Sequence, residues 1–332
     1  MTATNAVHAT GLVKAFGSFR AVDGIDLEVR QGEIFGVLGP NGAGKTTTLK
    51  MLATLLPIDG GEAEIFGVDV RREPHRIRQL VGVTGQYASV DENLTGAENL
   101  ILFARLLGQS TAQARRTAAD LLGRFGLEEA ADRQIQNFSG GMRRRLDLAA
   151  SLIARPPLIF LDEPTTGLDP RTRGQMWDTI RELVAQGSTI LLTTQYLDEA
   201  DQLADRIAVI DRGRKVAEGT PDQLKSSVGS STLHLRVVDR EQTAQAAAIV
   251  ERVLGEAPVL TPEAGGLNIA LGDANQTADV LIALRQGEVD ITTAAVRQPT
   301  LDEVFLTLTG HHAEDDDRDG RADSDQTDKE VA

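Results

Sequence analysis

Residues Gly39 to Thr46 place three glycines, a lysine and a threonine in the spacing G-x-x-x-x-G-K-[ST]. Glycine lets a backbone wrap closely around an anion, so that successive N–H groups point inward. Lys45 can then reach the β- and γ-phosphates of a nucleotide, and the Thr46 hydroxyl can bind Mg²⁺. The pattern predicts a phosphate-binding loop made of Gly39, Pro40, Asn41, Gly42, Ala43, Gly44, Lys45, Thr46 and the following Thr47.

Two adjacent carboxylates, Asp162 and Glu163, end the apolar run Leu158–Leu161. Asp162 is suited to hold Mg²⁺ through water. Because side chains alternate along a strand, Glu163 projects in a different direction, where it can polarise the water that attacks a γ-phosphate. A solvated strand end would also explain an isolated Asp-Glu pair. Together with the glycine-rich loop, however, the pair predicts hydrolysis of a nucleoside triphosphate.

Short apolar strands that alternate with longer amphipathic stretches must position these residues. The strand Ile34–Leu38 leads into the loop and a helix over Thr47–Leu56 follows it, an order that a chance glycine-rich turn would not need. Further predicted strands are Leu158–Leu161, Thr189–Leu192 and Ile207–Ile210. This alternation predicts an α/β fold with a mixed, mainly parallel sheet covered by helices.

The last third of the chain is organised differently. A short helix near Thr220–Asp222 ends the first domain, predicted as 1–225, and the serine- and glycine-rich residues 226–231 follow as a linker. Residues 232–310 are predicted to form a small α+β domain, and the highly charged residues 311–332 a disordered acidic tail. The elements predicted in the small domain are strands at Thr232–Val238 and Leu267–Leu271 and helices at Glu241–Leu254, Thr277–Gln286 and Leu301–Leu308.

Composition limits the classes of partner. The formal net charge is −15, and residues 314–332 hold −6 of it, with nine acidic and three basic side chains. An acidic chain lacks the positive field that non-specific binding to nucleic acid requires. No apolar run approaches the ~18 residues of a membrane-spanning helix, Met1–Thr10 lacks the pattern of a signal peptide, and cysteine is absent. We therefore expect a cytoplasmic protein that reaches a membrane only through a partner.

A third motif, Asn137–Met142, precedes a helix predicted over Arg143–Ala154. A serine followed by two glycines is by itself a common helix cap and turn. In combination with the loop and the carboxylates, Phe-Ser-Gly-Gly-Met resembles the signature motif of ABC ATPases, in which Leu-Ser-Gly-Gly-Gln is usual. That resemblance implies that Ser139, Gly140 and Gly141 bind the γ-phosphate of a nucleotide held by an opposite subunit.

Other elements of that family occur in the expected order. The resemblance implies that Phe16 stacks on adenine, although an ordinary core aromatic is the alternative. It assigns Gln86 to contact Mg²⁺ and to link the site to a helical subdomain at about 87–154, and it assigns Asp169 to cross a dimer interface. ATP and Mg²⁺ are the expected ligands, and the metal-binding residues would be Thr46, Gln86 and Asp162.

Gln195 departs from the family, which usually has a histidine after this strand. Glutamine can donate a hydrogen bond to a γ-phosphate but cannot carry a proton. Lys45, Glu163 and Gln195 are the predicted catalytic residues, and turnover should rest mainly on Glu163. Slow hydrolysis, or regulation through ATP binding without hydrolysis, are the alternatives that Gln195 leaves open.

The segments Thr193–Ala200, Phe138–Ala149 and Arg297–Leu306 look like the daunorubicin and doxorubicin resistance branch of the family. The resemblance implies a bacterial motor on the cytoplasmic side of the cell membrane, which pairs with a separate polytopic permease and exports a hydrophobic, anthracycline-like drug. Two copies would close as a homodimer on Mg-ATP, and the helix Leu94–Gly108 would transmit the motion to the permease. The helix Leu301–Leu308 either closes the C-terminal core or docks on the neighbouring subunit.

Two other functions are weighed against drug export. A polysaccharide or lipid exporter would use the same motor, since the motor does not bind the cargo. A soluble ABC ATPase acting on ribosomes or DNA is less favoured, because the chain has one set of motifs and lacks the coiled coils or zinc modules of such proteins. Arg143–Arg145 is expected to be a solvated helix face and not a nucleic-acid patch.

Overall fold

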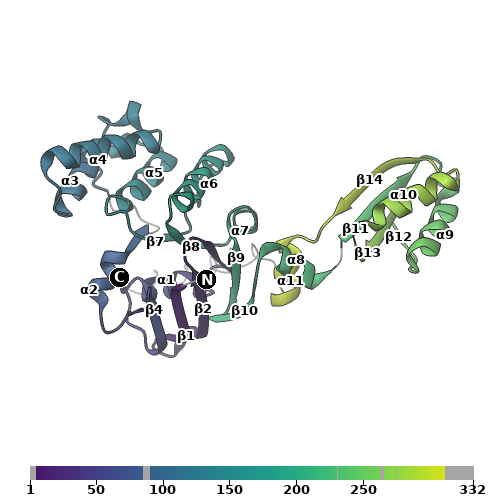
Figure 1. The fold of residues 1–332 in the computed structure, drawn as a ribbon, viewed down its shortest axis with the longest axis horizontal. Coiled ribbons are helices and arrows are strands. Elements are labelled where there is room, and N and C mark those ends of the chain that lie inside the picture. The colour runs from purple at the N-terminus through teal and green to yellow at the C-terminus, as the bar shows by residue number, and fades with distance from the viewer. Residues whose placement is uncertain (1–4, 85–89, 230, 262–264, 274, 311–332) are drawn as a thin grey trace, which may run out of the picture. The chain divides into compact units, whose positions relative to one another are not determined.

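The computed structural model describes residues 5–84, 90–229, 231–261, 265–273 and 275–310 (Figure 1). These residues form two compact units, one ending at Pro221 and the other beginning at Asp222. Within the described ranges, no helix is long and apolar enough to cross a bilayer.

Six strands form the central sheet of the first unit, in the order β10-β9-β3-β8-β7-β6. Neighbouring strands run parallel, except that β10 is antiparallel to β9. Every residue of β3, β7 and β8 is buried, which accounts for their uninterrupted apolar sequences. The strands are β3 (Ile34–Leu38), β6 (Val81–Thr84), β7 (Leu158–Asp162), β8 (Thr189–Thr194), β9 (Arg206–Asp211) and β10 (Arg214–Gly219).

Alternate residues of the central strands face two different cores. Leu158 and Phe160 of β7 pack in a core that includes Leu49 of α1, whereas Ile159 and Leu161 pack in a core that includes Ile180 of α6. The sheet therefore separates the helix that follows the phosphate loop from the helices on its other side. On the first side lie α1 (Lys45–Leu52) and α2 (Pro74–Leu80), and on the other lie α6 (Pro170–Ala185) and α7 (Leu197–Leu203).

A second, antiparallel sheet with the order β2-β1-β4-β5 packs on the α1 side of the central sheet. Its long strands β1 and β2 are joined by a tight turn, and the register between them shifts at several bulges. The sequence pattern did not predict this sheet. Its strands are β1 (Asn5–Phe16), β2 (Phe19–Arg30), β4 (Gly60–Ile65) and β5 (Val68–Asp69).

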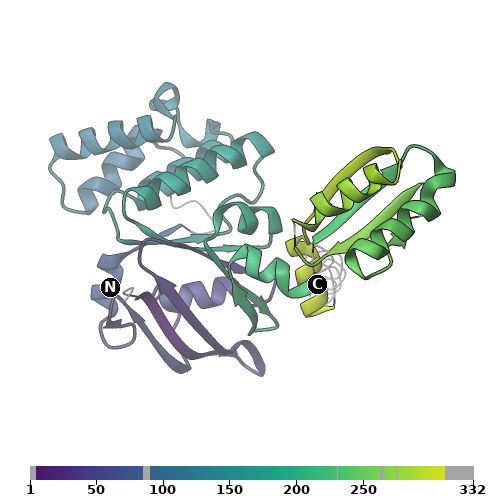
Figure 2. The same cartoon turned by 45° about the vertical axis from the view of Figure 1, so that its right-hand side comes forward.

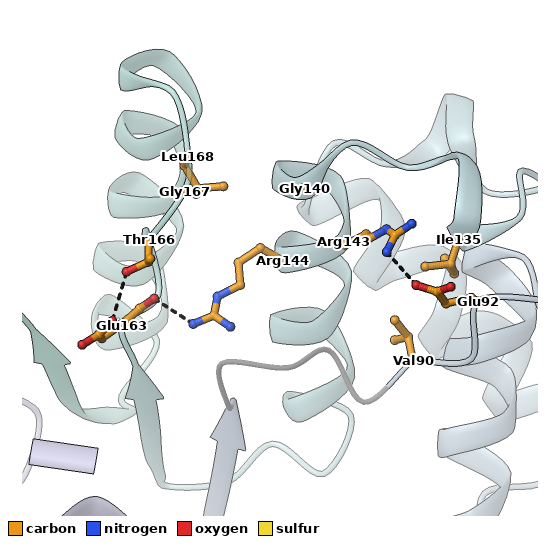
Figure 3. A pocket seen from close by; sticks show the side chains of 10 residues that line it. All are labelled: Val90, Glu92, Ile135, Gly140, Arg143, Arg144, Glu163, Thr166, Gly167 and Leu168. Atoms are coloured by element: carbon orange, nitrogen blue, oxygen red, sulfur yellow. Dashed lines mark hydrogen bonds and ion pairs between the residues drawn. The ribbon is translucent and has the colours of Figure 1, made fainter. Parts of the chain in front are cut away.

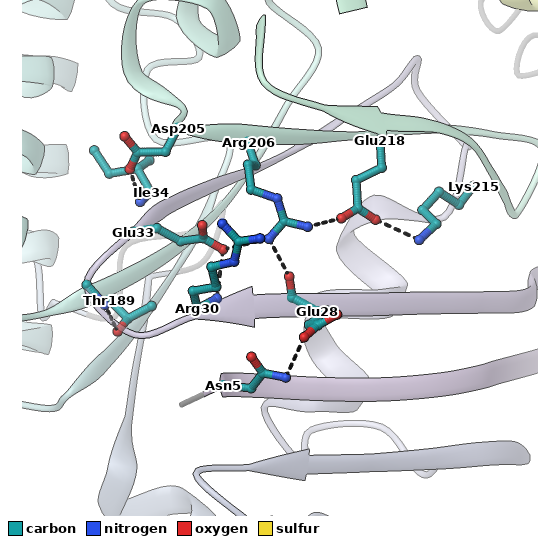
Figure 4. A network of polar contacts seen from close by, with 11 residues as sticks. Asn5, Glu28, Arg30, Glu33, Ile34, Thr189, Asp205, Arg206, Lys215 and Glu218 are labelled. Carbon is teal, nitrogen blue, oxygen red and sulfur yellow. Dashed lines mark hydrogen bonds and ion pairs between the residues drawn. The ribbon is translucent and has the colours of Figure 1, made fainter. Parts of the chain in front are cut away.

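A polar network fastens the two sheets of the first unit together where β3 begins (Figure 4). Arg206 Nη1 donates to the Glu28 carbonyl at 2.9 Å and to Glu33 Oε1 at 3.2 Å. Nearby, the Gly32 N–H donates to Thr189 Oγ1 at 3.0 Å. Burial raises the pKa of the Glu33 carboxyl, and the Arg206 guanidinium opposes that shift.

Three further helices lie together as a subdomain within the expected range 87–154 (Figure 2). Capping boxes begin two of them, in which Thr95 pairs with Glu98 and Ser110 pairs with Gln113. The helices are α3 (Gly96–Leu106), α4 (Thr111–Arg124) and α5 (Gly140–Ser151), with 3₁₀ turns at Glu128–Ala130 and Ile135–Asn137. The helix predicted over Arg143–Ala154 therefore begins three residues earlier, at Gly140, because Ser139 caps it.

The second unit has the strand and helix order βαββαβ, with the sheet order β12-β13-β11-β14 and antiparallel neighbours. Leu233 and Leu235 on one face of β11 pack against α9 and α10, through side chains such as Val250 and Val280. Its strands are β11 (Ser231–Val237), β12 (Val259–Leu260), β13 (Gly266–Leu271) and β14 (Ile291–Arg297), and its helices are α8 (Pro221–Val228), α9 (Thr243–Leu254), α10 (Gln276–Gln286) and α11 (Leu301–Thr309).

The residues expected as a linker, 226–231, take part in regular structure at both ends. Ser226 Oγ donates to the Asp222 carbonyl and Ser227 Oγ donates to the Leu224 carbonyl, each at 2.7 Å. The serines thus bond back into the last turn of α8 instead of interrupting it. Ser231 already belongs to β11.

Candidate active site

The glycine-rich loop joins the end of β3 to the start of α1. Gly44 has φ +102°, and a Cβ atom there would lie 2.3 Å from the Ala21 carbonyl oxygen. At Gly39 a Cβ atom would lie 2.2 Å from the Ile210 carbonyl oxygen. Only glycine fits such positions, so the loop packs closely against Ala21 of β2 and Ile210 of β9.

Lys45 is buried between the loop and the carboxylates. Its Nζ donates to the carbonyls of Gly39 at 2.8 Å and Pro40 at 3.0 Å, and it lies 3.4 Å from Glu163 Oε1. Burial lowers the pKa of the Lys45 ammonium, while the carboxylates of Glu163 and Asp162 oppose that shift. A buried cation at this point of the loop is suited to pair with a phosphate.

Asp162 ends β7 beside two threonine hydroxyls. Thr46 Oγ1 donates to its Oδ1 at 2.8 Å, and Thr193 Oγ1 donates to the same oxygen at 2.6 Å. A hydroxyl and a carboxylate are hard oxygen ligands of the kind that Mg²⁺ prefers, and Mg²⁺ in nucleotide sites needs only one or two protein carboxylates beside the phosphates. The residues present therefore fit the metal predicted from the sequence.

Glu163 follows Asp162 with an unusual backbone conformation. Its φ is +49°, in the left-handed region that non-glycine residues rarely adopt. The backbone N–H donates to the Thr193 carbonyl at 3.0 Å, and Oε2 accepts from Thr166 Oγ1 at 3.3 Å (Figure 3). The turn brings the carboxylate next to Lys45, on the side where the loop would hold a phosphate.

A cavity of about 290 Å³ lies over the loop. The structure brings most of the predicted nucleotide-binding residues together around it, and Phe16, at 49% exposed, lines it with Phe19, at 60% exposed. Two exposed aromatics at the turn between β1 and β2 favour stacking on a base over an ordinary core position. The residues that line the cavity are Phe16, Phe19, Ala21, Pro40, Asn41, Gly42, Ala43, Gly44, Lys45, Thr46, Thr47 and Glu163.

Gln195 comes directly after β8 and is half-buried. The carbonyl of the preceding Thr194 accepts from the Gly39 N–H at 3.3 Å. The end of β8 therefore lies beside the first residue of the phosphate loop, and Gln195 follows it directly but is not among the residues that line the cavity. Gln86 lies outside the described residues.

Ser139 and Asp169 cap two helices. Ser139 Oγ accepts from the Met142 N–H at 3.2 Å and begins α5, while Asp169 accepts from the Thr172 N–H at 3.0 Å and Oγ1 at 2.6 Å and begins α6. The Thr172 hydrogen bonds lower the pKa of the Asp169 carboxyl. At Gly141 a Cβ atom would lie 2.7 Å from Thr172 Cγ2, so the two helices touch there. These residues do not line the cavity over the loop.

The expectation of a solvated face at Arg143–Arg145 is wrong. All three arginines are half-buried and donate to backbone carbonyls, and Arg143 also pairs with Glu92 at 2.7 Å. Arg145 Nη1 donates to the Phe125 carbonyl at 2.9 Å. The carbonyls that accept these hydrogen bonds belong to other segments of the chain. The spacing of the arginines along one helix therefore does not reveal the arrangement.

Residues 22–166 match the ABC transporter family, and residues 219–309 match the C-terminal domain of DrrA1-3-like ATP-binding proteins. The daunorubicin/doxorubicin resistance ATP-binding protein DrrA of Streptomyces peucetius is 54% identical over 94% of this chain and 94% of its own. The chain belongs to this family of ABC transporter ATP-binding proteins. The daunorubicin resistance ATP-binding protein DrrA2 of Streptomyces coeruleorubidus is 48% identical over 93% of this chain and 96% of its own.

A solved ATP-binding cassette has the same fold. It is a dimer in a post-hydrolysis state bound to ADP and Pi, with a TM-score of 0.60 and 26% identity, and the match covers 64% of this chain and 98% of that one. The fold predicted from the sequence, an ABC ATPase with a C-terminal α+β domain, is confirmed. As a member of the ABC family, the chain is an ATP-hydrolysing subunit of a transporter.

Proposed function

We propose that this ATPase drives export of a hydrophobic, anthracycline-like compound through a separate membrane permease. The observation that carries the proposal is the similarity to anthracycline resistance ATP-binding proteins along nearly the whole chain, including the C-terminal unit. The described residues include no helix that could span a membrane. In this proposal a partner permease provides the path through the membrane and holds the ATPase at its cytoplasmic side.

In the proposed mechanism, the loop from Gly39 to Thr47 binds the ATP phosphates through its N–H groups, and Lys45 pairs with the β- and γ-phosphates. Phe16 stacks on the adenine. Thr46, Asp162 and Gln86 are the residues that hold Mg²⁺. When bound with ATP, Mg²⁺ neutralises charge on the β- and γ-phosphates.

Glu163 acts as the general base. Its carboxylate orients a water molecule and takes a proton from it as the water oxygen bonds to the γ-phosphorus and the bond to the β-phosphate oxygen breaks. Gln195 donates a hydrogen bond to the γ-phosphate and so helps to fix its position. Because glutamine stays neutral, it adds no charge stabilisation of the kind that a protonated histidine would supply.

A homodimer completes each site. Ser139, Gly140 and Gly141 contact the γ-phosphate bound to the partner copy, and Asp169 lies at the interface between the copies. The exposed helix start at Ser139 supports this assignment, since the N-terminus of a helix favours an anion. ATP binding closes the dimer, hydrolysis opens it, and the helical subdomain passes the motion to the permease.

Affinity capture from detergent-solubilised membranes would test the partner. The full-length Glu163→Gln variant, held with Mg-ATP, serves as bait, and Lys45→Ala serves as the matched control that should not form the closed dimer. We expect mass spectrometry to recover a polytopic membrane protein with the first bait alone. Reproducible recovery of ribosomal or DNA-repair proteins instead would contradict the transporter partner.

The cargo is tested in cells that contain the ATPase and the captured permease. We expect cells with the wild-type pair to retain less of a fluorescent anthracycline than cells with the Glu163→Gln pair. Equal retention of the drug, together with a loss of surface polysaccharide or lipid in the variant, would refute drug export and identify the other cargo.

A further inference from the structure

Arg144 of α5 reaches the end of β7, the strand that ends in Asp162. Arg144 Nη2 donates to the Asp162 carbonyl at 2.5 Å and to the Glu163 carbonyl at 2.9 Å, and Nε donates to the Pro164 carbonyl at 3.2 Å. Figure 3 shows this side chain extending from α5 to the loop after β7. A single guanidinium therefore binds three consecutive carbonyls.

The left-handed conformation of Glu163 explains why three carbonyls converge. In an extended strand, successive carbonyls point to opposite sides, but the positive φ at Glu163 turns the chain so that they gather on one side. Gathered acceptors inside a protein need donors. The planar fork of an arginine can bind several acceptors at once, whereas an ammonium group acts as a compact point charge.

Four carboxylates surround the Arg144 guanidinium at longer range. Burial lowers its pKa, and the charges of Asp147, Asp162, Glu199 and Glu163 oppose that shift. The guanidinium remains a cation, since arginine does not lose its proton in proteins. Its charge thus strengthens the hydrogen bonds to the carbonyls.

We infer that Arg144 is a positioning residue for ATP hydrolysis, which holds the Glu163 backbone in the left-handed turn that directs its carboxylate toward the phosphate loop. Arg144 is not among the residues that line the cavity over the loop, and it lines a different cavity together with Glu163. The inference rests on the proposed function, in which Glu163 is the general base. The hydrogen bonds to the Asp162 and Pro164 carbonyls hold the residues on either side of Glu163, so the effect of Arg144 on turnover passes through the position of Glu163.

The first experiment compares Arg144→Gln, Arg144→Lys and Arg143→Gln in the full-length chain. Misplacement of a reacting group by about 1 Å costs on the order of 10²-fold in rate. We expect Arg144→Gln to lower kcat by about that factor and to leave KM for ATP within about threefold, since ground-state binding is unchanged. Arg144→Lys should lose at least tenfold in kcat by the same reasoning.

Arg143→Gln is the matched control, because it removes the neighbouring guanidinium, which pairs with Glu92 and donates to the Gln136 carbonyl rather than to the carbonyls of residues 162–164. It should retain wild-type kcat. Thermal unfolding of each variant separates lost turnover from lost folded protein. If Arg144→Gln does not fold, Arg144→Lys, which keeps the charge and the aliphatic stem, gives the result.

A double-mutant cycle with Glu163→Gln distinguishes positioning from a general structural role. If Arg144 acts through Glu163, then Arg144→Lys should lower single-turnover hydrolysis by less than about twofold in the Glu163→Gln background. Multiplicative losses, or wild-type kcat in both Arg144 variants, would overturn the inference. Near-normal turnover of Glu163→Gln itself would instead refute the proposed general base, so the two failures are distinguishable.

Discussion

Removal of the Thr193 hydroxyl tests how the Asp162 carboxylate, which is proposed to bind the metal, is held in place. Thr193 is fully buried, and its Oγ1 donates to Asp162 Oδ1 at 2.6 Å. Valine has nearly the same shape, so Thr193→Val removes this hydrogen bond without opening a cavity. It also removes the hydrogen bond at 3.2 Å that Oγ1 accepts from the Glu163 N–H, which keeps its bond to the Thr193 carbonyl. A hydrogen bond to a charged group contributes about 1.5–3 kcal/mol, and Thr46 remains as the other donor to this oxygen.

The loss should appear in both stability and turnover. We expect the free energy of unfolding to fall by about 1.5–3 kcal/mol. If most of this free energy is also lost from the transition state, where the ionised Asp162 carboxylate is needed, kcat falls by roughly 10- to 100-fold, since about 1.4 kcal/mol corresponds to a factor of ten. Urea unfolding measures the first quantity, and phosphate release at saturating Mg-ATP measures the second.

Thr189→Val provides a control on the same strand. Thr189 is also buried, but its Oγ1 accepts from the Gly32 N–H at 3.0 Å, at the end of β8 away from Asp162. This variant should lose about 1–3 kcal/mol of stability because a backbone donor is left unsatisfied, yet keep its kcat. If the two variants had the same kcat within twofold, the reasoning about Asp162 would be wrong.

Three further predictions follow from the site and the core. Glu163→Gln should lower turnover by about 10²–10⁴-fold and leave ATP binding intact by equilibrium titration, and retained turnover would exclude Glu163 as base. Phe16→Ala should weaken ATP binding by about 1–3 kcal/mol, and Phe16→Trp should not. Equal ATP affinities of wild type and Phe16→Ala would show that adenine does not stack on Phe16. Burial raises the pKa of the Glu199 carboxyl above 4.5, so its contribution to stability is present below pH 4.5 and is lost as pH rises through the raised value. Unfolding curves of wild type and Glu199→Gln should therefore converge or cross as pH rises, and a constant difference would refute this assignment.

The strands around the phosphate loop could be predicted because burial on both faces leaves a plain apolar pattern. The predicted strand Ile34–Leu38 coincides with β3, and Leu158–Leu161 lies within β7. The long strand β1 was missed because bulges in Asn5–Phe16 break the alternation that would identify a strand, whereas β2 does alternate over its second half and could have been predicted. The strand Ile291–Arg297 is exposed along most of its length, so it carries no apolar periodicity.

The phosphate loop and the carboxylates could be found from the sequence because each is a short contiguous motif, although the two lie 116 positions apart where Thr46 meets Asp162. Phe19, Thr193 and Arg144 could not be assigned in this way. Arg144 binds carbonyls 18 to 20 positions further along, and its role depends on the packing of α5 against the end of β7. Phe19 could have been noticed as a second aromatic in the same turn as Phe16.

The cap at Ser139 constrains which residues could replace it over evolution. Serine, threonine, asparagine and aspartate all accept the hydrogen bond that begins a helix. A hydroxyl or an amide side chain can accept the Met142 N–H and still donate a proton to an anion, whereas aspartate has no proton to donate and would add a negative charge facing the phosphate in the proposed dimer. Drift at this position should therefore exclude aspartate, even though the helix itself would tolerate it.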